Sequence, residues 1–163
     1  MAYYTSAVAN WTPAAIADGS QLSASNYHAL RSAAASNYVT IGEIAVFGLV
    51  TATAININAL RRHTTASTTP TNRVPAQTNV LGVASVFQGF ITASTNPTVA
   101  ALATIQHVLE LPINGYGGIF RWVALPGSEI VLTGTSANNN EISISTVGTG
   151  LSAQSSHFVV TEL

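Results

Sequence analysis

The side chains of this chain that could perform hydrolytic chemistry are its carboxylates, its histidines and its many serines. The carboxylates are Asp18, Glu43, Glu110, Glu129, Glu141 and Glu162. Glycoside hydrolysis needs two carboxyl groups that flank one bond, and no two of these occur in a motif that would pair them. Five of the six lie on or at the ends of predicted strands, where glutamates are usually solvated. We therefore expect no catalytic carboxylates.

Nucleophilic and metal chemistry also lack their usual motifs. The histidines are His28, His63, His107 and His157, and they do not have the spacing of HExxH or of other metal sites. The alternation of a strand places His107 on one face with Ile105 and Leu109, which indicates a hydrogen-bonded core or interface histidine. The serines do not occur in the GxSxG context of a nucleophile elbow. We expect no enzyme activity, no metal and no cofactor.

The basic residues are too few for a nucleic-acid surface. Arg61, Arg62 and His63 form the main basic cluster, with Arg73 nearby. A nucleic-acid-binding domain needs a broad positive face, and the formal net charge of this chain is −1. We therefore expect a solvated loop, or one that contacts an acidic partner, and no nucleic-acid partner.

The composition predicts a folded protein that associates with copies of itself. Hydrophobic residues make up 47% of the chain and charged residues only 7%, against about 25% charged residues in an ordinary soluble domain. The high hydrophobicity argues against disorder. No apolar run reaches the roughly 18–20 residues of a membrane-spanning helix, and no signal-peptide pattern opens the chain. A nearly neutral surface has little electrostatic repulsion to keep copies apart.

From residue 41 onward the pattern is one of strands separated by turns. We predict strands at residues 43–50, 55–58, 80–91, 104–111, 119–125, 129–133, 141–147 and 157–163. The stretch that contains Ile55 and Ile57 alternates cleanly with Asn56 and Asn58. About eight short strands without helices between them predict an all-β, antiparallel β-sandwich, and the count fits a jelly roll. An immunoglobulin-like strand order remains open.

The N-terminal part reads differently and predicts a short helix. The helix would run from Ser23 or Ser25 to Ala35, since either serine could cap its first turn. Tyr27 and Leu30 would share one face of it. This apolar stripe is thin, and an isolated helix of this length is marginal in water, so the helix needs a surface to lie against.

These patterns divide the chain into an N-terminal arm with a short helix at residues 1–40 and a β-sandwich domain at residues 41–163. The arm carries aromatic and apolar side chains with no regular period, which we expect to anchor on another protein. The side chains that we expect to make these contacts are Tyr3, Tyr4, Trp11, Ile16, Tyr27 and Leu30.

Residues 119–130 form the most distinctive segment of the sandwich. An aromatic strand, a Pro-Gly turn and a second apolar strand predict a core hairpin. Phe120 and Trp122 fall on one face and Arg121 on the other, where an arginine needs a partner that Glu129 or Glu110 could provide. The residues that we assign to the oligomer contact or the core are His107, Phe120, Arg121, Trp122 and Glu129.

The cysteine-free composition rich in Thr, Ser, Asn and Ala, the arm, and the segment at 119–130 together resemble the decoration (cement) proteins of tailed-phage heads. The resemblance extends over the whole chain in composition and in the pattern of its segments. It matches no family motif, so it assigns no role to an individual residue. It implies a homotrimer on the capsid exterior of the virion that bridges neighbouring capsid subunits. The implied partners are further copies of the chain and the major capsid protein, with no membrane and no small-molecule ligand.

Two other non-enzymatic functions remain open. One is a carbohydrate- or receptor-binding module of a virion fibre, in which Tyr116 or Trp11 could stack on a sugar. The other is a small jelly-roll capsid protein that forms the shell itself.

Overall fold

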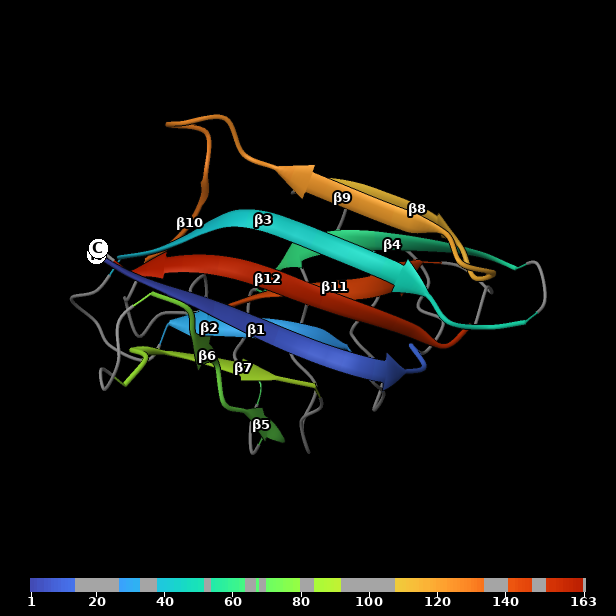
Figure 1. Cartoon of the computed structure of the whole chain (residues 1–163), viewed down its shortest axis with the longest axis horizontal. Coiled ribbons are helices and arrows are strands. Elements are labelled where there is room, and N and C mark those ends of the chain that lie inside the picture. The colour runs from blue at the N-terminus through green and yellow to red at the C-terminus, as the bar shows by residue number, and fades with distance from the viewer. Residues whose placement is uncertain are drawn as a thin grey trace.

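The computed structural model describes residues 1–13, 27–32, 38–51, 54–63, 67, 70–79, 84–91, 108–133, 141–147 and 152–162. All regular secondary structure within these residues is β-strand, in two antiparallel sheets that pack as a sandwich (Figure 1). The all-β, antiparallel sandwich expected from the sequence is therefore confirmed.

One sheet, which we call sheet A, has the order β10-β3-β12-β1-β6, and β9 also pairs with β3. Its strands are β1 (Ala2–Trp11), β3 (Tyr38–Gly48), β6 (Ala76–Gln77), β9 (Ile119–Val123), β10 (Ile130–Thr133) and β12 (Gln154–Glu162). The alternation of β12 shows how the sheet faces the core. Phe158 and Val160 are buried, while His157 and Val159, which alternate with them, are partly exposed. This period of two is the pattern of a strand with one face on the core.

The other sheet, sheet B, has the order β5-β7-β2-β11-β4-β8. Its strands are β2 (His28–Ser32), β4 (Ile55–Arg62), β5 (Asn72–Arg73), β7 (Phe87–Phe90), β8 (Leu109–Asn114) and β11 (Glu141–Val147). The core lies between the two sheets, with Ile41 and Phe158 from sheet A and Leu60 and Ile144 from sheet B among its buried side chains. Sheet A therefore has a second face that points away from this core.

The helix predicted in the N-terminal part is wrong over His28–Ser32, which form the strand β2. β2 pairs with β11 on one side and with β7 on the other. Pairing on both edges satisfies its backbone, and its position between these strands buries Leu30 completely. A helix with a thin apolar stripe has no comparable gain, so tertiary pairing outweighs the local propensity.

The described part of residues 1–40 is not a separate arm, because β1 and β2 are strands of the two sheets. β1 lies between β12 and β6, and Trp11 at its end donates a hydrogen bond from Nε1 to Ser156 Oγ at 3.0 Å. Of the expected anchoring side chains, Tyr3 is exposed, Ile16 lies outside the described residues, and the buried ones are Tyr4, Trp11, Tyr27 and Leu30. These four belong to the folded domain and are not available on its surface.

The predicted hairpin at 119–130 is also corrected. β9 and β10 do not pair with each other; both pair with β3, at Glu43–Phe47 and at Tyr38–Ile41 respectively. The predicted faces of β9 are confirmed, since Phe120 and Trp122 pack against the core and Arg121 points away from it. His107 lies outside the described residues.

Candidate functional site

A buried carboxylate organises an extended polar cluster within the described part of the chain. Glu141, the first residue of β11, is completely buried. His63 Nδ1 lies 2.5 Å from Glu141 Oε1, which also accepts a hydrogen bond from the Ser67 hydroxyl. Arg31 Nε donates to Glu141 Oε2 at 2.7 Å. The expectation that strand-end glutamates are solvated is therefore wrong for Glu141.

The partners of Glu141 decide its charge state. Burial raises the pKa of Glu141, but hydrogen bonds from His63 and Ser67 and the charges of His63 and Arg31 outweigh it. The net effect holds the pKa below the usual value for a glutamate, so the carboxylate stays ionised. A buried carboxylate of this kind stabilises the fold only while its cations and donors remain in place.

The same cluster contains a row of residues that resembles a catalytic triad. His63 Nε2 lies 2.7 Å from Ser143 Oγ, on the opposite side of the ring from Glu141. This is the order of groups in a serine hydrolase, in which a histidine held by a carboxylate takes the proton of a serine. Here, however, Ser143, His63 and Glu141 all have no exposed surface. A nucleophile needs contact with its substrate, so the burial favours a structural network.

The burial of Ser143 predicts its behaviour toward an activated-serine probe. We expect no labelling of the folded protein by a fluorophosphonate over several hours, because the probe must contact Oγ before it can react. Mass spectrometry of the intact chain measures this directly, with a known serine hydrolase as the positive control. Labelling of Ser143 that is lost in a His63→Ala variant would instead indicate a working hydrolase.

Sequence reasoning missed this cluster, although a signal for it exists. Glu141, Ser143 and Ser145 alternate with Ile142 and Ile144 along β11. The alternation identifies a strand with a polar face, but the partners are Arg31 in β2, His63 directly after β4, and Ser67, all far away in the chain. Only the pairing of the strands brings them together.

Arg121 has a different partner from the predicted ones. Its guanidinium donates to both carboxylate oxygens of Glu43, from Nε at 2.8 Å and from Nη2 at 2.7 Å. The register places Val123 opposite Glu43 and Arg121 opposite Ala45, so Arg121 and Glu43 are diagonal neighbours on one face. The hydrogen bond from Arg121 is the main cause of a lowered pKa for Glu43. The expected pairing of Arg121 with Glu129 or Glu110 is therefore wrong.

The outward face of sheet A carries several exposed apolar side chains. The exposed side chains that the register places on it are Tyr3, Tyr38, Ile119, Val123 and Val131, and we call this set the apolar face. They come from β9 and β10, from β3, with which both of these pair, and from β1, which β12 separates from β3 (Figure 1). Antiparallel sheets with one solvated face normally carry polar side chains there. Exposed apolar side chains that share one face of a sheet are candidates for an interaction site.

Comparisons with known proteins leave the chain to be interpreted from its own structure. No protein-family model, curated protein or solved structure matches it. Within the described residues, no three His, Asp or Glu side chains form a group that could hold a metal ion. The same residues contain no helix long and apolar enough to cross a membrane.

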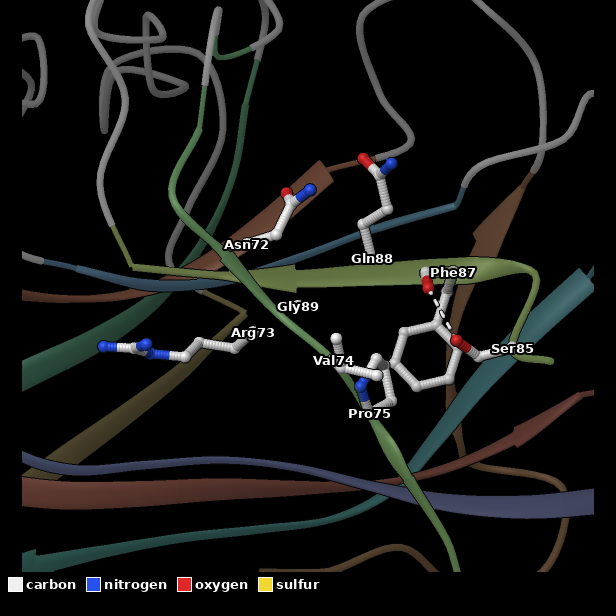
Figure 2. Close-up of a pocket in the computed structure, with 8 residues that line it drawn as sticks. All are labelled: Asn72, Arg73, Val74, Pro75, Ser85, Phe87, Gln88 and Gly89. Atoms are coloured by element: carbon white, nitrogen blue, oxygen red, sulfur yellow. Dashed lines mark hydrogen bonds between the residues drawn. The ribbon is translucent and has the colours of Figure 1, made fainter.

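The described surface has pockets, of which two bear on function. One, of about 200 Å³, lies between β5 and β7 and is lined by Val74, Pro75 and Phe87 among others. Figure 2 shows Arg73 at its edge, extending away from the other labelled side chains. The second, of about 330 Å³, lies on the outward side of sheet A, and we call it the Tyr3 pocket. Its lining residues are Met1, Tyr3, Thr40, Gly42, Glu129 and Thr161.

Proposed function

We propose that this protein is a structural, non-enzymatic component of a phage virion, which decorates the capsid exterior as a homo-oligomer and stabilises it by binding between capsid subunits. The observation that carries the proposal is the apolar face, which a protein working alone in water would not need. The assignment to a capsid rests on the resemblance to phage decoration proteins, which also implies a homotrimer with the major capsid protein as partner.

The strand order supports a jelly roll, the finer architecture expected for such a protein. When the short strands β5, β6 and β7 are set aside, and β9 and β10, which pair with successive parts of β3, are counted as one edge strand, the sheets run β1-β12-β3-β9/β10 and β2-β11-β4-β8. Strands that follow one another in the chain alternate between the sheets, except from β4 to β8. This interleaving is typical of the eight-stranded jelly rolls of viral capsid and lectin domains.

The charge pattern supports self-association through the apolar face. Its five exposed side chains are uncharged, and two of the charges near them, Arg121 and Glu43, neutralise each other. A net charge of −1 gives copies little mutual repulsion. On a capsid many copies bind at once, so a modest affinity per contact is multiplied by multivalency. A weak, neutral and apolar contact is therefore sufficient.

Two isoleucines of equal exposure provide a matched test of this surface. Ile119 on the apolar face and Ile55 on sheet B are each 69% exposed. We expect Ile119→Lys to weaken self-association at least about tenfold, which is about 1.4 kcal/mol, because a lysine would lose its water in the contact. Ile55→Lys should have no effect. Light scattering coupled to size-exclusion chromatography measures both, with a trimer expected for the native protein.

Binding to the capsid needs its own measurement. Undecorated phage heads should carry the native protein to the bottom of a sucrose gradient, whereas Ile119→Lys should remain near the top. A native protein that is monomeric at every concentration and does not sediment with heads would overturn the proposal.

A carbohydrate-binding module is the second candidate function. Tyr116 is 64% exposed in the turn between β8 and β9, where its ring could stack on a sugar. Trp11, the other stacking residue considered from the sequence, is buried. Binding of the native protein to a glycan array, lost in Tyr116→Ala, would favour this function over the first.

A further inference from the structure

We propose that copies of this protein associate head to tail, with Arg73 of one copy inserted into the Tyr3 pocket of the next, where it pairs with Glu129. The inference rests on the proposed self-association and adds to it the two residues that make the contact and its direction. It commits the pocket to one occupant, a second copy of this chain.

The pocket is built to receive a cation. Glu129, at its edge, is only partly exposed, and its carboxylate has no ion pair or hydrogen bond within the described part of the chain. The register explains why, since Arg121, the arginine expected to pair with it, is held by Glu43. Tyr3 also lines the pocket and contributes an aromatic side chain to it. A carboxylate and an aromatic ring together form a favourable environment for a guanidinium group.

The pocket also has the space for a long side chain. Its volume is about 330 Å³, within the range of pockets that enclose a ligand. Gly42 lies in its lining, and a side chain built there would meet nothing within 4 Å. The Thr40 hydroxyl donates to the Thr161 carbonyl at 3.3 Å, so the Thr40 oxygen can still accept a hydrogen bond from an incoming group.

Arg73 is the arginine that can fill it. The chain has no lysine, and its five basic residues are arginines. Arg31 and Arg121 are held by glutamates, Arg62 donates to the Val131 carbonyl at 2.8 Å, and Arg61 is buried. Arg73 is exposed and has no ion-pair or hydrogen-bond partner for its side chain among the described residues. A cation and a carboxylate, each left unpaired in one copy, complement each other between copies.

The two groups lie toward opposite edges of the sandwich, which gives the contact its direction. Glu129 precedes β10, at one edge of sheet A, whereas Arg73 lies in β5, at the far edge of sheet B beside β6. Figure 1 shows β9 and β10 on one side of the molecule and β5 and β6 on the other. Val74, next to Arg73, is 91% exposed and can pack on the apolar face. Contacts between two different patches generate a closed ring, such as a trimer, when the rotation between neighbouring copies closes, and an open filament when it does not.

Charge reversal tests the pairing in the full-length protein. Arg73→Glu and Glu129→Arg should each fold, because both positions are on the surface, and each should weaken self-association at least about tenfold. The double variant R73E/E129R should recover native self-association, since the reversed charges again attract. Sedimentation velocity over a concentration series measures the assembly, and circular dichroism confirms the fold of each variant.

Mixing the two single variants tests the direction and the copy number. In the mixture, the glutamate introduced by Arg73→Glu can pair with the arginine introduced by Glu129→Arg in a neighbouring copy. Two neighbouring copies of the same variant would bring like charges together, so only assemblies in which the two variants strictly alternate are restored. A dimer or a four-membered ring can alternate, but a three-membered ring cannot. Full recovery of a trimer in the double variant and none in the mixture is the expected result.

The outcomes separate this inference from the proposed function. A native oligomer that is unchanged by Arg73→Glu and Glu129→Arg would overturn the head-to-tail pairing and leave self-association standing. Loss of assembly in both single variants without recovery in the double variant would also overturn the direct pairing. A native protein that is a monomer throughout would overturn both proposals.

Discussion

Replacement of Glu141 by alanine is expected to lower the free energy of unfolding by about 3–5 kcal/mol, the usual cost of breaking a buried ion pair. The variant would leave His63 buried without its carboxylate and would remove the ion pair of Arg31. Ser67 would lose an acceptor for both its backbone N–H and its hydroxyl. This loss is a large fraction of the total stability of a domain, about 5–15 kcal/mol.

Urea unfolding followed by circular dichroism measures the effect, and Glu43→Gln is the matched control. Glu43 also binds an arginine through two hydrogen bonds, but Arg121 is largely exposed, so the loss should be much smaller. If the two variants lost the same free energy of unfolding, the burial of the Glu141 cluster would make no contribution to stability. Glu141→Gln, which keeps the shape of the side chain, should lie between them.

Acid is expected to destabilise the protein through His28. Burial, with a smaller contribution from the charge of His157, lowers the pKa of His28 to about 3 from 6.5. Below pH 6.5 the unfolded chain therefore takes up a proton that the folded protein excludes, so stability falls as the pH is lowered toward 3. The slope approaches about 1.4 kcal/mol per pH unit for one such group.

The neutral form of His28 is the one that its surroundings fit. Its Nε2 lies 3.1 Å from Ser6 Oγ and its Nδ1 lies 2.9 Å from Ser156 Oγ. A neutral imidazole has one N–H and one unprotonated nitrogen. One of the two serine hydroxyls can accept from the N–H, and the other can donate to the unprotonated nitrogen. A protonated ring has two donors and would place a charge between the sheets, far from water.

His28→Gln should remove most of the dependence on pH, because the amide has both a donor and an acceptor and does not titrate in this range. Unfolding free energies at about pH 7, 6 and 5 are sufficient to measure it. The pKa of Glu141 lies below its usual value of 4.5, so stability from Glu141 is lost only at lower pH. His157→Gln is the control and should keep the slope. An unchanged slope in His28→Gln would contradict the assignment.

The strands of the sandwich could be predicted from the sequence where polar and apolar residues alternate without interruption. β11 is an example, since its predicted and observed bounds are both Glu141–Val147. The same reasoning fails for β1 for physical reasons. Ser6 takes one of the inward positions, so the apolar period is interrupted. Between Val8 and Trp11 the register shifts, and Asn10 has a positive φ of 52°. A segment with a polar inward residue and a bulge lacks a regular period, although it is fully paired.

The candidate sites depend on contacts that no local pattern contains. Glu129 and Arg121 were both recognised from the sequence, but the register of β9 on β3 gives Arg121 to Glu43. This pairing leaves Glu129, which lines the Tyr3 pocket, without an arginine partner among the described residues. The five side chains of the apolar face likewise come from strands that are distant in the chain, so the surface exists only once the sheet has formed.

The asparagines of β4 help to determine the register in which this strand pairs with its neighbours. Asn56 and Asn58 face inward and are fully buried, while Ile57 between them is exposed. Both amides donate to Gln154 Oε1, at 3.0 and 3.1 Å, and Gln154 Nε2 donates back to Asn58 Oδ1 at 2.9 Å. If β4 slipped by one residue, the isoleucines would turn inward, a shift that apolar burial alone would favour. The hydrogen bonds among Asn56, Asn58 and Gln154 form only in the native register. They therefore specify a register that the burial of apolar side chains alone would not favour.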